Sequence, residues 1–197
     1  MSNESGQSSG ASGPLLILSG PSGVGKTSVL KKLIETGGLP LRQSVSATTR
    51  PPRSGEINGK DYHFLSAEEF ASELLADGFL EHAEVYGQLY GTLRREVESW
   101  RLKGFGVVLA IDVQGADQVR GKTKVDSSVF LTAPEEFLRQ RLKSRGTDLP
   151  EVIERRLANA RSEIQRSNDY NHVLINMELE KVVFELAGLW RPFFDRE

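Results

Sequence analysis

One segment near the N-terminus combines glycines, a lysine and a hydroxyl residue at a fixed spacing. Residues 20–27 read GPSGVGKT and fit the pattern G-x-x-x-x-G-K-[ST]. Glycines let backbone N–H groups converge on phosphate oxygens, and a helix that begins here adds partial positive charge. Lys26 would neutralise the β- and γ-phosphates of a nucleotide such as ATP, and the Thr27 hydroxyl would bind Mg²⁺. The candidate phosphate-binding residues are Gly20, Pro21, Ser22, Gly23, Val24, Gly25, Lys26 and Thr27.

A second group of residues could bind a monophosphate. Arg50 and Arg53 are three positions apart with two prolines between them, and Tyr62 and Tyr90 add phenolic donors. Guanidinium groups bind phosphate through paired N–H contacts. Taken alone, the two arginines fit a solvated basic loop at least as well.

Asp112 follows an apolar run at residues 107–111. Ligands of α/β proteins gather at the carboxyl ends of the strands, which would place this carboxylate near a site. Taken alone, Asp112 also fits a polar residue that ends a strand.

Short apolar runs alternating with helical patterns must position these residues. Strands are predicted over 15–18, 107–111, 129–131 and 172–175, and helices over 26–34, from 134 to 145 and over 179–193. Buried parallel strands that alternate with helices predict an α/β fold with helices on both faces of the sheet. The strand before residues 20–27 and the helix after them argue against a chance glycine-rich turn.

Two segments interrupt this alternation. Residues 44–90 read as short strands with turn signals, and Asn58-Gly59 predicts a turn in a small antiparallel insertion. Residues 141–166 are arginine-rich and helical, and Pro150 is placed to begin a helix. Ile153, Leu157, Ala160 and Ile164 form the apolar face of that helix.

Composition excludes several other classes of protein. The 197 residues suit one domain, and 25 basic residues against 27 acidic ones, a net charge of -2, argue against nucleic-acid binding. No apolar run reaches the ~20 residues of a membrane span. With 0 cysteines and 3 scattered histidines, neither a disulfide nor a histidine–cysteine metal site is expected. The absence of cysteine fits a reducing compartment, so we expect a cytoplasmic protein, with residues 1–13 as a disordered polar tail.

Two longer segments carry a family resemblance. Residues 44–64, SVSATTRPPRSGEINGKDYHF, resemble the signature of guanylate kinases, and residues 78–92, GFLEHAEVYGQLYGT, resemble the second substrate segment of that family. With the phosphate loop, LAIDVQGA, RLKSRGT and VLIN, the resemblance runs from about residue 15 to residue 193. It implies a P-loop three-layer α/β fold with a parallel sheet. The core would be 14–43, 93–140 and 170–195, with a small mixed or antiparallel GMP-binding insertion at 44–92 and a helical lid at 141–169.

The resemblance also implies the reaction: reversible transfer of the ATP γ-phosphoryl group to GMP or dGMP, with Mg²⁺ as cofactor, by a monomer or small homo-oligomer. Guanine presents N1–H and N2–H₂ as adjacent donors, which a carboxylate and hydroxyls complement. The implied GMP-binding residues are Ser46, Arg50, Arg53, Tyr62, Glu81, Tyr90, Thr92 and Asp112. Asp112 would also hold the metal through water, and Asn176 would lie near the adenine of ATP. The implied catalytic residues are Lys26, Arg50, Arg141, Arg145 and Arg156, the last three from the lid.

The chain departs from the family pattern at Ala110, Asn171 and Met177, where acidic residues are usual. We expect these changes to alter the kinetics without abolishing activity. Two alternatives to a guanylate kinase remain. One is a domain of this family that has become a protein-binding module, and the other is a kinase for another phosphorylated acceptor. The intact Lys26 and Thr27 speak against the first, and Glu81 and Thr92 against the second.

Overall fold

The central element is a parallel β-sheet. The computed structural model describes residues 12–144 and 149–195. Five strands have the order β2-β7-β1-β8-β9, so that β1 lies in the middle, paired in parallel with β7 and β8. The strands are β1 (Leu15–Ser19), β2 (Leu41–Gln43), β7 (Gly106–Ala110), β8 (Ser127–Thr132) and β9 (His172–Ile175). The predicted α/β fold with a parallel sheet is confirmed.

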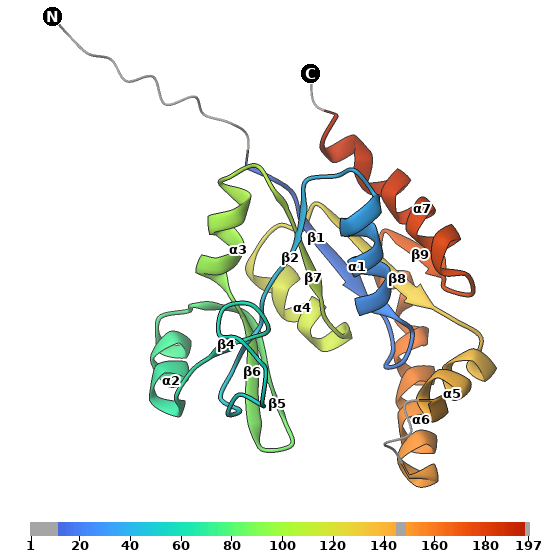
Figure 1. The fold of residues 1–197 in the computed structure, drawn as a ribbon, viewed down its shortest axis with the longest axis horizontal. Helices are drawn as coiled ribbons and strands as arrows, with labels where there is room; N and C mark the ends of the chain where they lie inside the picture. The colour runs from blue at the N-terminus through green and yellow to red at the C-terminus, as the bar shows by residue number, and fades with distance from the viewer. Residues whose placement is uncertain (1–11, 145–148, 196–197) are drawn as a thin grey trace, which may run out of the picture.

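Helices cover both faces of this sheet (Figure 1). Alternate residues of β1 point to opposite faces, so Leu16 and Leu18 belong to one apolar cluster while Leu15 and Ile17 belong to another. The first cluster contains residues of α1 (Lys26–Thr36), α5 (Glu135–Ser144), α6 (Pro150–Gln165) and α7 (Leu179–Trp190). The second contains residues of α3 (Arg94–Arg101) and α4 (Val113–Lys122). Burial on both faces explains why these strands read as continuous apolar runs.

The insertion forms a second, mixed sheet with the order β4-β3-β6-β5. Its strands are β3 (Ala47–Thr48), β4 (His63–Phe64), β5 (Phe79–Val85) and β6 (Gln88–Leu93). The predicted turn at Asn58-Gly59 is present, with Gly59 at φ 76, but it does not join an antiparallel hairpin, because β3 and β4 are parallel. The hairpin joins β5 to β6 instead, through Tyr86 (φ 52) and Gly87 (φ 75), the left-handed pair that suits a tight hairpin.

Helix α2 (Ala67–Leu75) of the insertion was not predicted. Its first turn carries a capping box, in which the Ser66 side chain accepts from Glu69 N and the Glu69 carboxylate accepts from Ser66 N. Phe70 of α2 stacks on Phe79 of β5 with ring centroids 4.3 Å apart. The S-x-x-E spacing at residues 66–69 was the sequence signal for this helix.

Several element ends differ from the expectations. Strand β7 ends at Ala110, one residue before the predicted end, and Asp112 is the N-cap of α4. The last α-helix ends at Trp190 and passes into the 3₁₀ helix η2 (Arg191–Phe193). Gly13, which was predicted to belong to the disordered tail, is buried, and its N–H donates to Arg101 O at 2.8 Å.

In the part of the chain that the structure describes, no helix has the length and apolarity to cross a membrane.

The insertion and the α5–α6 pair project from the same end of the main sheet, on its two sides (Figure 1). The 3₁₀ helix η1 (Ser167–Asp169) leads from α6 back to β9. The space between the two projections is the place to look for a site, because the carboxyl end of β1 opens toward it.

Candidate active site

The phosphate loop is a strained turn that only glycine tolerates at several positions. Gly20 (φ 140), Gly23 (φ 84) and Gly25 (φ 98) have positive φ angles between β1 and α1. Gly25 is the N-cap of α1, and a Cβ atom there would lie 2.8 Å from Asn176 Nδ2. The loop therefore leads directly into the N-terminus of α1, where anions bind favourably.

Lys26 lies folded over this loop. Its Nζ donates to Gly20 O and lies 3.4 Å from Pro21 O, and the side chain is half-buried. Thr27 is exposed in the first turn of α1. A phosphate ligand could thus replace the carbonyl oxygens as the partner of the ammonium group.

Two residues distant in sequence fasten the loop through the carbonyl of Val24. Asn176 Nδ2 donates to Val24 O at 2.7 Å, and Arg141 Nη1 donates to the same oxygen at 2.9 Å. Arg141 Nη2 also donates to Asn176 O at 2.9 Å. Asn176 is buried, with no partner for its Oδ1 among residues 12–144 and 149–195. The structure therefore brings Arg141 and Asn176 together at the phosphate loop.

Two carboxylates converge beneath the insertion. Glu81 on β5 faces Thr92 on β6, and Thr92 Oγ1 donates to Glu81 Oε1 at 2.6 Å. A Cβ atom on Gly115 would lie 3.3 Å from Glu81 Oε2 and 3.5 Å from Asp112 Oδ1. Burial raises the pKa of Glu81, the hydrogen bond from Thr92 opposes this, and the charge of Asp112 adds to it. The pair forms a partly dehydrated acceptor site for N–H donors.

Arg50 is held in an aromatic and acidic setting. Its Nη2 lies 2.8 Å from Glu56 Oε1, and its guanidinium carbon lies 5.3 Å from the Tyr62 ring centroid and 5.7 Å from that of Phe64. The Glu56 hydrogen bond raises the pKa of Arg50, and the same bond lowers the pKa of Glu56. The Tyr90 hydroxyl also contributes to the raised pKa of Arg50. Arg50, Tyr62 and Tyr90 are thus neighbours.

The other predicted acceptor residues lie close to this group. Arg53 is exposed, and its backbone N–H donates to Glu56 Oε2 at 2.6 Å. Ser46 lines a cavity of about 290 Å³ together with Tyr62. Glu56 was missed in the sequence, although its place three residues after Arg53 in a short basic turn was a signal for pairing.

Glu163 of α6 is a second residue that the sequence analysis missed. It lines a polar cavity of about 410 Å³ together with Asp112 and Arg166. Its Oε2 is buried and has no hydrogen-bond partner in the described ranges. Burial raises the pKa of Glu163, while Lys26 opposes this and Asp112 adds to it. The signal was a carboxylate between Ala160 and Ile164 on the apolar face of the helix.

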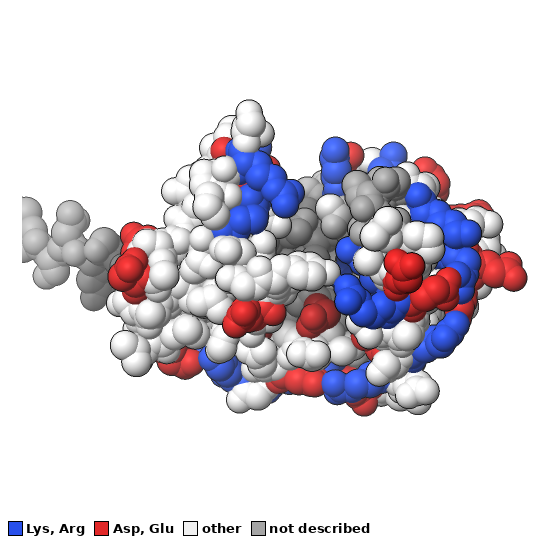
Figure 2. All heavy atoms as spheres, turned by 90° about the horizontal axis from the view of Figure 1, so that it is seen from below, with Lys and Arg blue, Asp and Glu red and all other residues white. Residues whose placement is uncertain are grey.

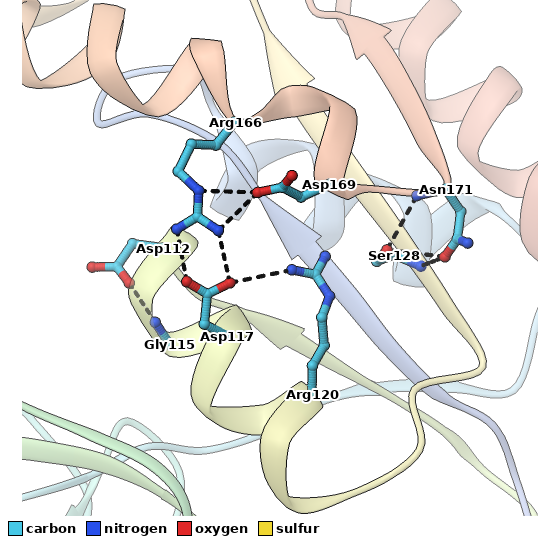
Figure 3. A network of polar contacts seen from close by, with 8 residues as sticks. All are labelled: Asp112, Gly115, Asp117, Arg120, Ser128, Arg166, Asp169 and Asn171. Atoms are coloured by element: carbon cyan, nitrogen blue, oxygen red, sulfur yellow. Dashed lines mark hydrogen bonds and ion pairs between the residues drawn. The ribbon is translucent and has the colours of Figure 1, made fainter.

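A network of charges fastens the end of α6 to α4 (Figure 3). The Arg166 guanidinium donates to both carboxylate oxygens of Asp117, at 2.7 and 3.0 Å, and to Asp169 Oδ2 at 2.7 and 3.0 Å. Arg120 lies 3.6 Å from Asp117. Paired contacts of this planar group fix direction as well as distance. The C-terminal end of α6 is therefore tied to α4, the helix that Asp112 caps.

The three departures from the family pattern differ in their surroundings. Asn171 Oδ1 accepts from Ser128 N at 2.8 Å and from Ser128 Oγ at 2.9 Å, as a carboxylate oxygen would (Figure 3). Ala110 ends β7 and packs against the main apolar cluster, and Met177 is exposed. The amide of Asn171 thus supplies the acceptor that its position requires.

Not every arginine of the lid is placed to bind a substrate. Basic atoms gather over α5 and α6, with acidic atoms among them (Figure 2). Arg139 pairs with Glu154, and Arg161 Nη2 lies 2.6 Å from Glu135 Oε1. Arg156 is half-buried on α6, and Arg145 lies outside the described residues. Arg139 and Arg161 thus pair with carboxylates of α5 and α6, whereas Arg141 contacts the phosphate loop.

The sequence profile of the guanylate kinase family matches residues 12–191. The chain belongs to the guanylate kinase family. It is 46% identical over 178 residues to the guanylate kinase of Neisseria gonorrhoeae, covering 90% of this chain and 86% of that protein. It is 49% identical over 170 residues to the enzyme of Gloeobacter violaceus, covering 86% of this chain and 82% of that one.

A solved structure agrees with this membership. The crystal structure of guanylate kinase from Anaplasma phagocytophilum superposes with a TM-score of 0.70 at 32% identity, covering 95% of this chain and 89% of that chain. As a guanylate kinase, this chain is an enzyme that transfers a phosphoryl group from ATP to GMP. Of the three functions considered from the sequence, the family match supports this one.

Proposed function

We propose that the phosphate loop binds the phosphates of ATP and that the insertion, together with the first turn of α4, binds GMP. The observation that carries this division is the convergence of Glu81 and Asp112 at Gly115. Guanine offers adjacent N1–H and N2–H₂ donors to such carboxylates. Adenine would leave Glu81 unpaired, and sites built on hydrogen bonds reject such analogues by ~10⁴ or more.

The acceptor phosphate would bind Arg50, Arg53, Tyr62, Tyr90 and Ser46. Arg50 is oriented by Glu56, whose Oε1 lies 2.8 Å from Nη2, and by Pro51 O, which accepts from Nη1 at 2.7 Å. Its remaining N–H groups would bind the phosphate. None of these residues is assigned to the ribose 2′-hydroxyl. We therefore expect dGMP to be a substrate as well as GMP.

The residues fit Mg²⁺ as the metal that accompanies ATP. Thr27 presents an exposed hydroxyl at the start of α1. Mg²⁺ keeps several waters and binds substrate phosphates, so one hydroxyl ligand from the protein suits it. Thr27 would bind the ion directly and Asp112 through water. The bound ion would neutralise charge on the phosphate oxygens.

Lys26, Arg50, Arg141, Arg145 and Arg156 would neutralise the charge of the transferring group. The acceptor is already an anionic phosphate oxygen, so no general base is required. Lys26 would exchange Gly20 O for the β- and γ-phosphates. Glu163, which lines one cavity together with Asp112 and whose pKa the charge of Lys26 lowers, would act as a positioning residue for the ammonium group. We expect a cytoplasmic monomer or small homo-oligomer that needs no nucleic acid.

A coupled assay with ATP and a panel of acceptors tests this proposal. The panel contains GMP, dGMP, AMP, UMP, CMP and ribose phosphates. We expect turnover of GMP and dGMP and values of kcat/KM lower by ~10⁴ for the others. A preference for AMP or for a ribose phosphate would contradict the assignment of Glu81 as the residue that recognises guanine.

A further inference from the structure

A cavity of about 470 Å³ lies at the base of the insertion, outside both substrate sites. Its walls come from β2, from α3, from β4 and from the turn before β4, and include Arg42, Trp100, His63 and Gly59. No residue assigned above to ATP, GMP or the metal lines it. We propose that this cavity binds a small anion of the phosphate class, such as inorganic phosphate, pyrophosphate or a compact phosphate ester.

Two cations at the cavity, Arg42 and Lys103, carry positive charge that is unpaired among the described residues. The Arg42 guanidinium lies 3.8 Å from the centroid of the Trp100 ring, and the Lys103 ammonium lies 4.3 Å from the same ring. Neither cation forms an ion pair within residues 12–144 and 149–195. A guanidinium that contacts a ring through its face keeps the N–H groups on its edge available, and those groups match phosphate geometry.

The remaining polar groups of the cavity do not neutralise this charge. Arg95 adds a third cation, which pairs with Glu73 away from the cavity lining. Glu96 is the one carboxylate in the lining, and it accepts from Ser44 Oγ at 2.7 Å. His63 Nε2 is buried and has no partner in the described part of the chain. With Arg95 paired to Glu73, Arg42 and Lys103 face Glu96 alone, so the cavity lining keeps a net positive charge in a chain whose net charge is -2.

Size and shape narrow the class of ligand. The volume lies within the roughly 300 to 1,000 Å³ typical of small-molecule sites. The indole ring of Trp100 already contacts two cations, so recognition would depend on charge rather than on stacking of a base. A compact anion with several phosphate oxygens satisfies both conditions.

The position of the cavity would allow a bound ligand to affect the acceptor site. Gln43 and Val45 line this cavity and also line the smaller cavity that contains Ser46 and Tyr62. A bound anion would touch both the core, through Arg42, and the insertion, through the segment at His63. It would therefore restrict movement of the insertion relative to the main sheet.

Trp100 provides a local signal for the test. The chain has 2 tryptophans, and Trp190 is fully buried in the main core. The indole N–H resonances of the full chain, loaded with GMP in magnesium-free buffer, are followed while inorganic phosphate or pyrophosphate is added at constant ionic strength. The substitution Trp100→Phe assigns the two resonances. We expect a saturable shift of the Trp100 signal.

The double variant Arg42→Gln with Lys103→Gln is the critical comparison, and Lys124→Gln with Lys181→Gln is the matched control. The first pair should weaken anion binding by about tenfold or more, and the second pair should leave it unchanged. Because all four side chains are exposed, both variants should melt like the wild type, and Lys103→Gln alone gives a second, milder test. A shift that does not saturate, or equal affinity in both double variants, would overturn the proposal.

Discussion

The phosphate loop and the acceptor insertion place charged side chains by different means. The loop is built from contiguous residues on the main sheet, and its partners Arg141 and Asn176 are fixed by the backbone carbonyl of Val24. The insertion has a small core of four buried residues, Ala47, Phe70, Phe79 and Leu93. Arg50 of the insertion contacts Glu56 and Pro51 O, and the Arg53 N–H donates to Glu56. The first site is thus held by residues from distant elements, whereas the arginines of the second are held by contacts within one short segment.

Lys26→Ala tests the phosphate loop and should have the largest effect. We expect kcat to fall by ~10³ or more, because the ammonium is the only loop side chain placed to neutralise the outer phosphates. The melting temperature should stay close to that of the wild type, since Lys26 is only half-buried and contacts carbonyls of its own loop. Steady-state turnover and thermal melting measure both. A variant that melts normally and retains most of its kcat would remove Lys26 from the mechanism.

Glu81→Gln tests the acceptor site. GMP should bind roughly ten- to hundredfold more weakly, because an amide cannot accept from both guanine donors in place of the carboxylate. Glu84→Gln, on the exposed part of the same strand, is the matched control and should leave GMP binding unchanged. Calorimetric titration with GMP gives both values, and equal losses in the two variants would contradict the assignment.

The raised pKa of Glu81 adds a pH signature. A carboxyl with a raised pKa in the folded state stabilises the fold below its unfolded pKa, and this contribution is lost as pH rises through the folded pKa. Glu81→Gln should therefore melt at or above the wild-type temperature near neutral pH. The GMP affinity of the wild type should fall as pH drops through that raised pKa, and this fall should be absent in the variant.

Glu163→Gln should have a smaller effect. Its carboxylate acts through Lys26 and Asp112 rather than on the substrate, so we expect kcat to fall by roughly three- to tenfold with little change in the KM for GMP. Removal of a buried charge should also keep or raise the melting temperature. Glu151→Gln, exposed at the start of α6, serves as the control. An unchanged kcat and pH profile would exclude a positioning role.

Closure of the cleft should give the smallest signal. The insertion and the lid should move toward the phosphate loop when both nucleotides bind, since arginines of separate segments must meet the same phosphates. Small-angle scattering should show a reduced radius of gyration with GMP and a non-hydrolysable ATP analogue together. No change on addition of both ligands would mean that the site is preformed.

The two regions also differ in how well the sequence predicted them. The motif at residues 20–27 is contiguous, so its strand, turn and helix were predicted nearly residue by residue. In the insertion, the Asn58-Gly59 turn was predicted but the strand pairing around it was not, because the parallel pairing of β3 with β4 is not encoded in the local pattern. Glu163 was missed for the same reason, since its neighbours Lys26 and Asp112 come from other elements.

The separation of donor and acceptor sites is tested most directly by calorimetry on two variants. Dissociation constants of GMP and of a non-hydrolysable ATP analogue are measured for Lys26→Ala and Arg50→Ala. Arg50→Ala should weaken GMP binding by roughly ten- to hundredfold and leave the ATP analogue unchanged, because its guanidinium lies with Tyr62 and Glu56 in the insertion. Lys26→Ala should show the reverse. If each variant lost affinity for both nucleotides to the same extent, the two sites would not be separate.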